Sequence, residues 1–206
     1  SQYRGGWGVT TSVEDLKLLK VPLLLMGIGT GTRFKGKVHA YSESSLAEIR
    51  LAHKYALGSS VRDVLTESFI QGLGIKKCMM TGCPATFVFD RPLSIRQSNK
   101  IVISFPPARF QKFKLIFFHL MSTIGSYIRY CHKRGFTPVL ACHDPRDIPI
   151  AKRFEKRAEI FFSEETSDFY ELYDSSALVL GFRLHAAIIS LSLGVPFIPV
   201  YFDHRG

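Results

Sequence analysis

Short, mostly apolar runs alternate along this chain with longer segments of helical periodicity. The clearest runs cover residues 21–27, 100–105, 137–142 and 177–180. A strand that is apolar throughout is typical of a parallel sheet whose two faces are both covered by helices. The order of these segments therefore predicts an α/β fold built from parallel sheets.

The two longest predicted helices lie between these runs. Residues 44–57 and 109–134 carry apolar side chains at helical spacing, and a glycine follows each segment. Ser59 and Ser60, which come just after the first of these helices, are expected to form a turn.

The best candidate for a linker is the polar segment 90–99, which contains a proline. This position predicts an N-terminal lobe over residues 1–95 and a C-terminal lobe over residues 96–206. With 206 residues and 46% hydrophobic composition, the chain is large enough for two small cores.

The net charge of +10 favours anionic partners such as phosphate-bearing small molecules, acidic glycans or an anionic lipid surface. The basic residues are spread along the chain without a nucleic-acid-binding signature, so no nucleic acid is expected as a partner. No apolar run is long enough to cross a bilayer, and no signal peptide opens the chain, so a cytoplasmic location is expected. The aromatic, basic segment 109–134 could touch a membrane surface, but a helix that covers a sheet explains its apolar stripe more simply.

Four cysteines form no CxxC pair, although Cys131 and Cys142 are each followed by a histidine. Zinc sites usually have closer ligand spacing, so reduced thiols and no metal site are the expectation.

The segment Gly181-Phe182-Arg183-Leu184-His185 begins where a buried strand gives way to a helix. In open α/β sheets, ligands bind at the carboxyl ends of the strands. Arg183 and the first amides of the helix could hold an anionic substrate while His185 exchanges a proton. A buried arginine paired with a local carboxylate, beside a histidine that fills space, explains the segment equally well.

Two other places could carry chemistry. The loop that begins Gly27-Ile28-Gly29 follows a strand and could cradle an anion, or it could be a plain tight turn. Arg62 lies at an expected helix start, where a cation is unfavourable unless an anion is near, and Asp63 or Glu67 could be that anion. Two arginines and a histidine at strand ends in separate lobes predict a small, multiply charged anion as the ligand.

Several motifs occur in a fixed order: Gly27-Ile28-Gly29, Ser60-Val61-Arg62-Asp63, Leu73-Gly74-Ile75, Thr81-Gly82-Cys83-Pro84-Ala85, then the Arg-Leu-His segment and Gly194-Val195-Pro196. In this order and spacing the chain resembles the polysaccharide pyruvyl transferase family from about residue 21 to residue 206. The resemblance implies two Rossmann-like lobes with parallel sheets, similar to B-type glycosyltransferases. It also implies an incomplete chain that lacks the first strands of its N-terminal lobe and a closing helix.

The activity implied by the resemblance is transfer of a pyruvyl group from phosphoenolpyruvate to two hydroxyls of a sugar, which gives a cyclic ketal. The acceptor would be a glycan or a lipid-linked saccharide, met in the cytoplasm or at the inner face of the membrane. Phosphoenolpyruvate is then a donor substrate, and no cofactor is expected.

The resemblance also implies roles for particular residues. Arg62, Arg183 and the backbone of Leu184 would bind the donor, with Gly29 in the glycine loop, and His185 would act as acid and base. Arg205 stands where the family commonly has a lysine, and it could replace that lysine in binding the substrate.

A glycosyltransferase of the same fold that uses a nucleotide sugar is the alternative enzyme. Such an enzyme usually places an acidic residue on the ribose, for which Glu164, Glu165 and Asp168 are the candidates. A glycan-binding module without catalytic activity is a further alternative.

Overall fold

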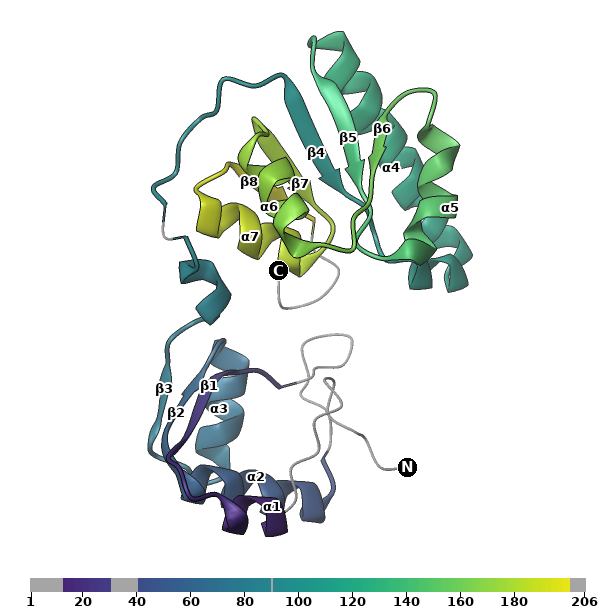
Figure 1. The fold of residues 1–206 in the computed structure, drawn as a ribbon. Helices are drawn as coiled ribbons and strands as arrows, with labels where there is room; N and C mark the ends of the chain where they lie inside the picture. Colours follow the sequence, from purple (N-terminus) through teal and green to yellow (C-terminus); the bar gives the residue numbers. More distant parts are fainter. Residues whose placement is uncertain (1–12, 31–40, 90, 201–206) are drawn as a thin grey trace. The chain divides into compact units, whose positions relative to one another are not determined.

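The computed structural model describes residues 13–30, 41–89 and 91–200 of the chain (Figure 1). These residues form two compact units, which meet in the sequence between Pro84 and Ala85. Each unit contains its own parallel sheet, of three strands in the first and five in the second. In the described ranges, no helix has the length and apolarity needed to cross a bilayer.

The first unit is a three-stranded parallel sheet in the order β1-β2-β3. Its core consists of Val61, Ile70 and Cys78, and through these residues the sheet packs against the helix over residues 64–72. The strands are β1 (Leu23–Ile28), β2 (Ala56–Val61) and β3 (Cys78–Met80), and the helices are α1 (Val13–Leu18), α2 (Glu43–Tyr55) and α3 (Val64–Gly72).

The central strand β2 occupies residues for which the sequence predicted the end of a helix and a turn, so that prediction was wrong. Its alanine, glycine and serines have little preference for extended structure and give no strand signal. The strand forms because its neighbours pair with it and its hydroxyls find partners. Ser60 Oγ accepts the Gly27 N–H at 3.0 Å, and Ser59 Oγ donates to the Lys77 carbonyl at 2.9 Å.

The second unit is a five-stranded parallel sheet in the order β6-β5-β4-β7-β8 (Figure 1). The chain runs outward from β4 through β5 to β6 and then crosses to β7 and β8 on the other side of β4. The strands are β4 (Lys100–Ser104), β5 (Thr137–Ala141), β6 (Glu159–Phe161), β7 (Leu178–Gly181) and β8 (Phe197–Pro199). The strand order reverses between β4 and β7, and this switch point is where open α/β sheets bind ligands.

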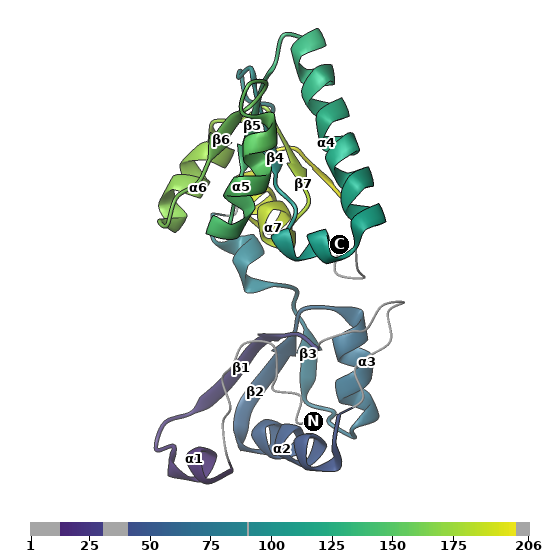
Figure 2. The ribbon, with the colours of Figure 1, turned by 90° about the vertical axis from the view of Figure 1, so that its right-hand side faces the viewer.

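Helices cover both faces of this sheet, which confirms the α/β fold with parallel sheets. The helix α4 (Lys114–Lys133) packs one face through Ile124 and Ile128 (Figure 2). The helices α6 (Thr166–Asp174) and α7 (Leu184–Leu193) contribute to a separate core on the other face. Neighbouring residues of β4 divide between the two cores, with Ile103 in one and Val102 in the other, which explains why successive residues in the middle of the strand are apolar. The short helix α5 (Ile148–Ala151) joins the α4 side.

The segment 91–98, which the sequence marks as part of a linker, is attached to the second unit. Arg91 and Arg96 each form an ion pair of 2.9 Å with Asp174 at the end of α6. The Ser94 N–H donates to the carbonyl of Gly194 at 2.9 Å. Gly194 has a φ of +67° and a Cβ there would overlap the Pro92 carbonyl oxygen, so glycine is required for this approach.

Candidate functional site

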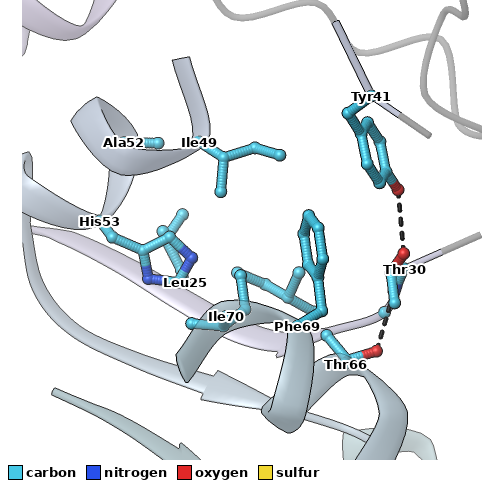
Figure 3. Close-up of a pocket in the computed structure, with 11 residues that line it drawn as sticks. Leu25, Thr30, Tyr41, Ile49, Ala52, His53, Thr66, Phe69 and Ile70 are labelled. Atoms are coloured by element: carbon cyan, nitrogen blue, oxygen red, sulfur yellow. Dashed lines mark hydrogen bonds between the residues drawn. The ribbon is translucent and has the colours of Figure 1, made fainter. Parts of the chain in front are cut away.

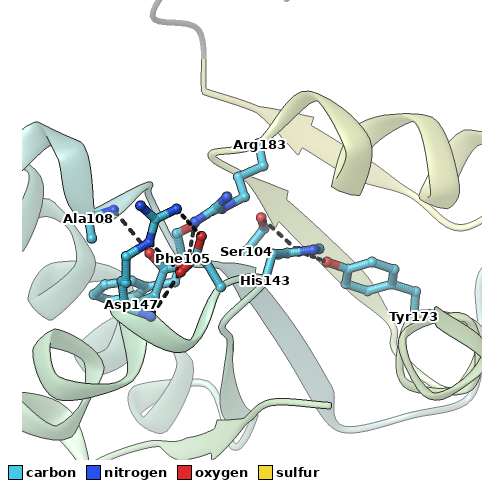
Figure 4. A network of polar contacts seen from close by, with 9 residues as sticks. Ser104, Phe105, Ala108, His143, Asp147, Tyr173 and Arg183 are labelled. Carbon is cyan, nitrogen blue, oxygen red and sulfur yellow. Dashed lines mark hydrogen bonds and ion pairs between the residues drawn. The ribbon is translucent and has the colours of Figure 1, made fainter. Parts of the chain in front are cut away.

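Arg183 lies at the carboxyl end of β7, where it is the residue that precedes the first turn of α7. Its Nε donates to the Phe105 carbonyl at 3.0 Å, and its Nη2 forms a short ion pair with Asp147 (Figure 4). The Arg183 side chain is 18% exposed and that of Asp147 is 1% exposed. The pairing of a buried arginine with a local carboxylate, one of the two explanations that the sequence allowed, is therefore present.

Asp147 ends the 3-10 turn Pro145–Asp147, and its Oδ1 also accepts the Ala108 N–H at 3.0 Å. Burial raises the pKa of this carboxyl, and the Arg183 charge opposes that rise. Within the described ranges, Nη1 of Arg183 has no hydrogen-bond partner. The guanidinium is thus held rigidly by two of its nitrogens, and the third can still meet a ligand.

Leu184 and His185 form the first turn of α7. The His185 side chain is exposed. The Leu184 N–H has no acceptor among the residues that the structure describes, and the N-terminus of a helix favours an anion. Arg183, Leu184 and His185 are therefore together at the switch point, as the sequence motif predicts from the end of a strand.

His143 is a residue of this edge that the sequence analysis considered only as a metal ligand. Its Nε2 lies 2.7 Å from the hydroxyl oxygen of Tyr173 and 3.4 Å from Ser104 Oγ (Figure 4). Its ring stacks on Phe169 with a centroid distance of 4.6 Å. Burial, followed by the charges of Arg183 and His185, lowers the pKa of His143 to about 3. The signal that could have found it is its place two residues beyond the end of β5.

Cys142, the neighbour of His143, is buried, and burial raises the pKa of its thiol to about 12. A thiol with so high a pKa is a poor metal ligand, because the thiolate is the form that binds. In the described part of the chain, no group of three or more His, Cys, Asp or Glu residues could hold a metal ion.

In the first unit the structure brings Gly29 and Arg62 together. Arg62 follows β2, and its N–H donates to the Ile28 carbonyl at 3.0 Å. The guanidinium lies so close to the Gly29 backbone that a Cβ there would come within 2.5 Å of Nη2. Its Nε is 3.7 Å from Asp63 Oδ2, while Asp63 Oδ1 caps α3 by accepting the Thr66 N–H at 2.8 Å. The carboxylate that the sequence suggested as a local partner is thus near, but its stronger contacts are with the helix.

Gly29 also borders an apolar pocket of about 190 Å³ (Figure 3). Hydroxyls lie on one side of it, where Thr30 Oγ1 is 2.9 Å from the Tyr41 hydroxyl and the Thr30 N–H donates to Thr66 Oγ1 at 2.9 Å. Opposite them lies His53, whose pKa is lowered by burial. The pocket combines an apolar wall with hydroxyl groups beside the Gly29 and Arg62 contact.

Two further predictions concern residues elsewhere. Glu164 and Glu165, candidates for a nucleotide ribose, are exposed, and Asp168 accepts the Ser163 hydroxyl at 2.6 Å beside the start of α6. Arg205 lies outside the described residues.

The sequence of this chain is similar to that of a known protein family. Residues 1–204 match the family described as polysaccharide pyruvyl transferase. A search of curated proteins returns no match. Because the family match extends over nearly the whole chain, from the glycine loop through the Arg-Leu-His segment, this protein belongs to the polysaccharide pyruvyl transferase family.

Proposed function

We propose that this chain transfers the pyruvyl group of phosphoenolpyruvate to two hydroxyls of one sugar residue, which produces a cyclic ketal and phosphate. Family membership supports pyruvyl transfer to a polysaccharide in general. The observation that carries this proposal is the exposed His185, in the first turn of a helix whose first residues adjoin the fixed guanidinium of Arg183.

The donor carries a phosphate and a carboxylate, and guanidinium and backbone amide groups of the chain would bind both. Arg183 offers Nη1 and its charge, and Leu184 offers a backbone N–H with the favourable end of the helix dipole. Arg62, positioned against Gly29 in the first unit, is also assigned to substrate binding. Arg205 is assigned a supporting role in substrate binding.

The reaction needs one proton at carbon and removes two from oxygen. His185, as an acid, protonates the methylene carbon of the donor, which leaves a cationic centre at C2. One sugar hydroxyl attacks C2 and its proton returns to His185. The C2–O bond to phosphate then breaks, and the second hydroxyl closes the ring as its proton leaves with the phosphate. The arginines stabilise the negative charge on the departing phosphate. Phosphoenolpyruvate serves as a donor substrate in this reaction, and none of the steps uses a cofactor.

Phosphate release from phosphoenolpyruvate, measured with galactose- and mannosamine-containing acceptors, tests this proposal. Activity should require both donor and acceptor and disappear in His185→Ala. His119→Ala, which removes another exposed histidine, is the matched control and should keep full activity. Nucleotide release from a sugar nucleotide without use of phosphoenolpyruvate would contradict the proposal and favour a glycosyltransferase.

The acceptor is proposed to be a glycan or a lipid-linked saccharide, and the start of α4 supports contact with a membrane surface. Phe113, Leu115 and Phe118 are 57%, 72% and 70% exposed there. Lys112 and Lys114 lie between and beside them, and no acidic residue occurs from position 91 to position 143. Exposed aromatic and aliphatic side chains beside lysines match the chemistry of an anionic bilayer surface.

Sedimentation with vesicles tests this contact. The chain should bind vesicles that contain phosphatidylglycerol and not those of phosphatidylcholine alone. The double variant Leu115→Ser/Phe118→Ser should weaken binding at least about 30-fold, because the two large apolar side chains together contribute roughly 2 to 4 kcal/mol. Leu93→Ser/Ile95→Ser removes two equally exposed apolar side chains elsewhere and should bind normally. Self-association that the first double variant abolishes, without vesicle binding, would show that a second copy covers this surface.

A further inference from the structure

The polar cluster at the carboxyl ends of β4 and β5 contains a hydrogen bond whose direction has a chemical consequence. Ser104 and Tyr173 are fully buried, so their hydroxyls must pair with protein groups. His143 Nε2 is 2.7 Å from the Tyr173 hydroxyl oxygen, a short contact in the range of a strong hydrogen bond. A phenol is the better donor of this pair and an imidazole nitrogen the better acceptor. This chemistry favours donation from the Tyr173 hydroxyl to Nε2.

This direction determines the tautomer of His143. A neutral imidazole carries one proton, and when Nε2 accepts a hydrogen bond that proton is on Nδ1. In the described part of the chain, Nδ1 of His143 has no hydrogen-bond partner. No buried side-chain nitrogen or oxygen there lacks a partner, so Nδ1 reaches solvent.

The surroundings of His143 favour an anionic ligand at this N–H. The charges of Arg183 and His185 act on the ring, and together with burial they lower its pKa to about 3. The ring therefore stays neutral near pH 7 and can donate from Nδ1 without adding another charge. Phe169 covers one face of the ring and fixes its orientation.

We propose that His143 is a substrate-binding residue whose Nδ1–H donates a hydrogen bond to an anionic oxygen of phosphoenolpyruvate beside Arg183. The inference rests on the function proposed above. Tyr173 and Ser104 act through His143, since their contacts with Nε2 keep the ring proton on Nδ1, which faces the ligand. A purely structural histidine would use the same contact with Tyr173 but would give Nδ1 no role.

Two substitutions separate these roles. The side-chain amide of His143→Asn can place its N–H near the position of Nδ1, whereas that of His143→Gln reaches the position of Nε2 and can keep only the contact with Tyr173. Binding of phosphoenolpyruvate to the full chain, measured by calorimetry, should weaken about 10- to 100-fold in His143→Gln, as expected for a lost hydrogen bond to a charged group. In His143→Asn the Kd should stay within about threefold of the wild type. A structural role predicts the reverse order, with the Asn variant the more impaired.

Nitrogen NMR of the wild-type chain supplies a test that needs no variant to fold. The His143 ring should show the Nδ1–H tautomer, and its Nδ1 signal should shift when phosphoenolpyruvate or inorganic phosphate is added. An Nε2–H tautomer, or normal binding in His143→Gln, would overturn the inference and leave the proposed function intact. A wild-type chain that binds phosphate at Nδ1 but not phosphoenolpyruvate would instead contradict the proposed function and keep His143 as an anion-binding residue.

Discussion

Replacing Gly29 by alanine should impair catalysis while leaving the fold intact. The added Cβ would lie within 2.5 Å of Arg62 Nη2 and closer still to Nε and Cζ, whereas an ordinary carbon contact is about 3.5 Å. The guanidinium must therefore move by about 1 Å. Since a misplacement of about 1 Å in a positioning group can lower the rate about 100-fold, we expect kcat/KM for phosphoenolpyruvate to fall by that factor, or about 3 kcal/mol.

The stability of the Gly29→Ala variant should hardly change. Gly29 lies outside the positive-φ region, and the atoms displaced are the far end of a flexible side chain. The free energy of unfolding in urea should shift by less than about 1 kcal/mol. Gly72→Ala is the matched control, because a Cβ at Gly72 meets no atom within 4 Å.

A double-mutant cycle decides whether the effect runs through Arg62. When Arg62→Ala is already present, Gly29→Ala should change kcat/KM by less than about threefold. An equal 100-fold loss in that background would refute the reasoning, as would a similar loss in Gly72→Ala.

Three further predictions concern the stability of the second unit. Asp147→Asn leaves the Arg183 charge without its buried partner and should cost about 3 kcal/mol, seen as a fall in Tm of roughly 6 to 12 °C, and an unchanged Tm would contradict the pairing. Gly194→Ala should cost at least about 2 kcal/mol in urea unfolding, because the residue has positive φ and its Cβ would overlap the Pro92 carbonyl, and a neutral result would show that this segment moves aside easily. The lowered pKa of His143 means that the unfolded chain takes up a proton first on acidification. The contribution of His143 to the free energy of unfolding should therefore be full above about pH 6.5 and decline by up to about 1.4 kcal/mol per pH unit towards pH 3, and His143→Gln should flatten this decline in a series of thermal melts.

The sequence predicts the second sheet well because its inner strands are mostly apolar on both faces. β4, β5 and β7 are covered by helices on both faces, so the side chains on both sides of each strand are mostly apolar. β2 has the same central place in the first sheet, but four of its six residues are alanine, glycine or serine, so no apolar pattern distinguishes it from a turn. Its identity as a strand comes from pairing with β1 and β3, which are distant in the sequence.

The candidate site was predictable where a strand end and a motif coincide, as at Arg183 and His185. Asp147 was not predictable, because it is 36 residues from Arg183 and lies in a short turn with no pattern of its own. Its position at a strand end could have identified His143 as it did Arg183, since His143 lies two residues beyond the end of β5. The neighbouring Cys142 made zinc binding the only role considered for this histidine from the sequence.

The make-up of β2 has a consequence for how the first unit comes apart. A central strand composed mostly of small residues has little intrinsic preference for extended structure. When β1 or β3 unfolds and its pairing with β2 is lost, β2 should therefore unfold as well. The unit therefore has no part that can persist alone, and its melting should be all-or-none.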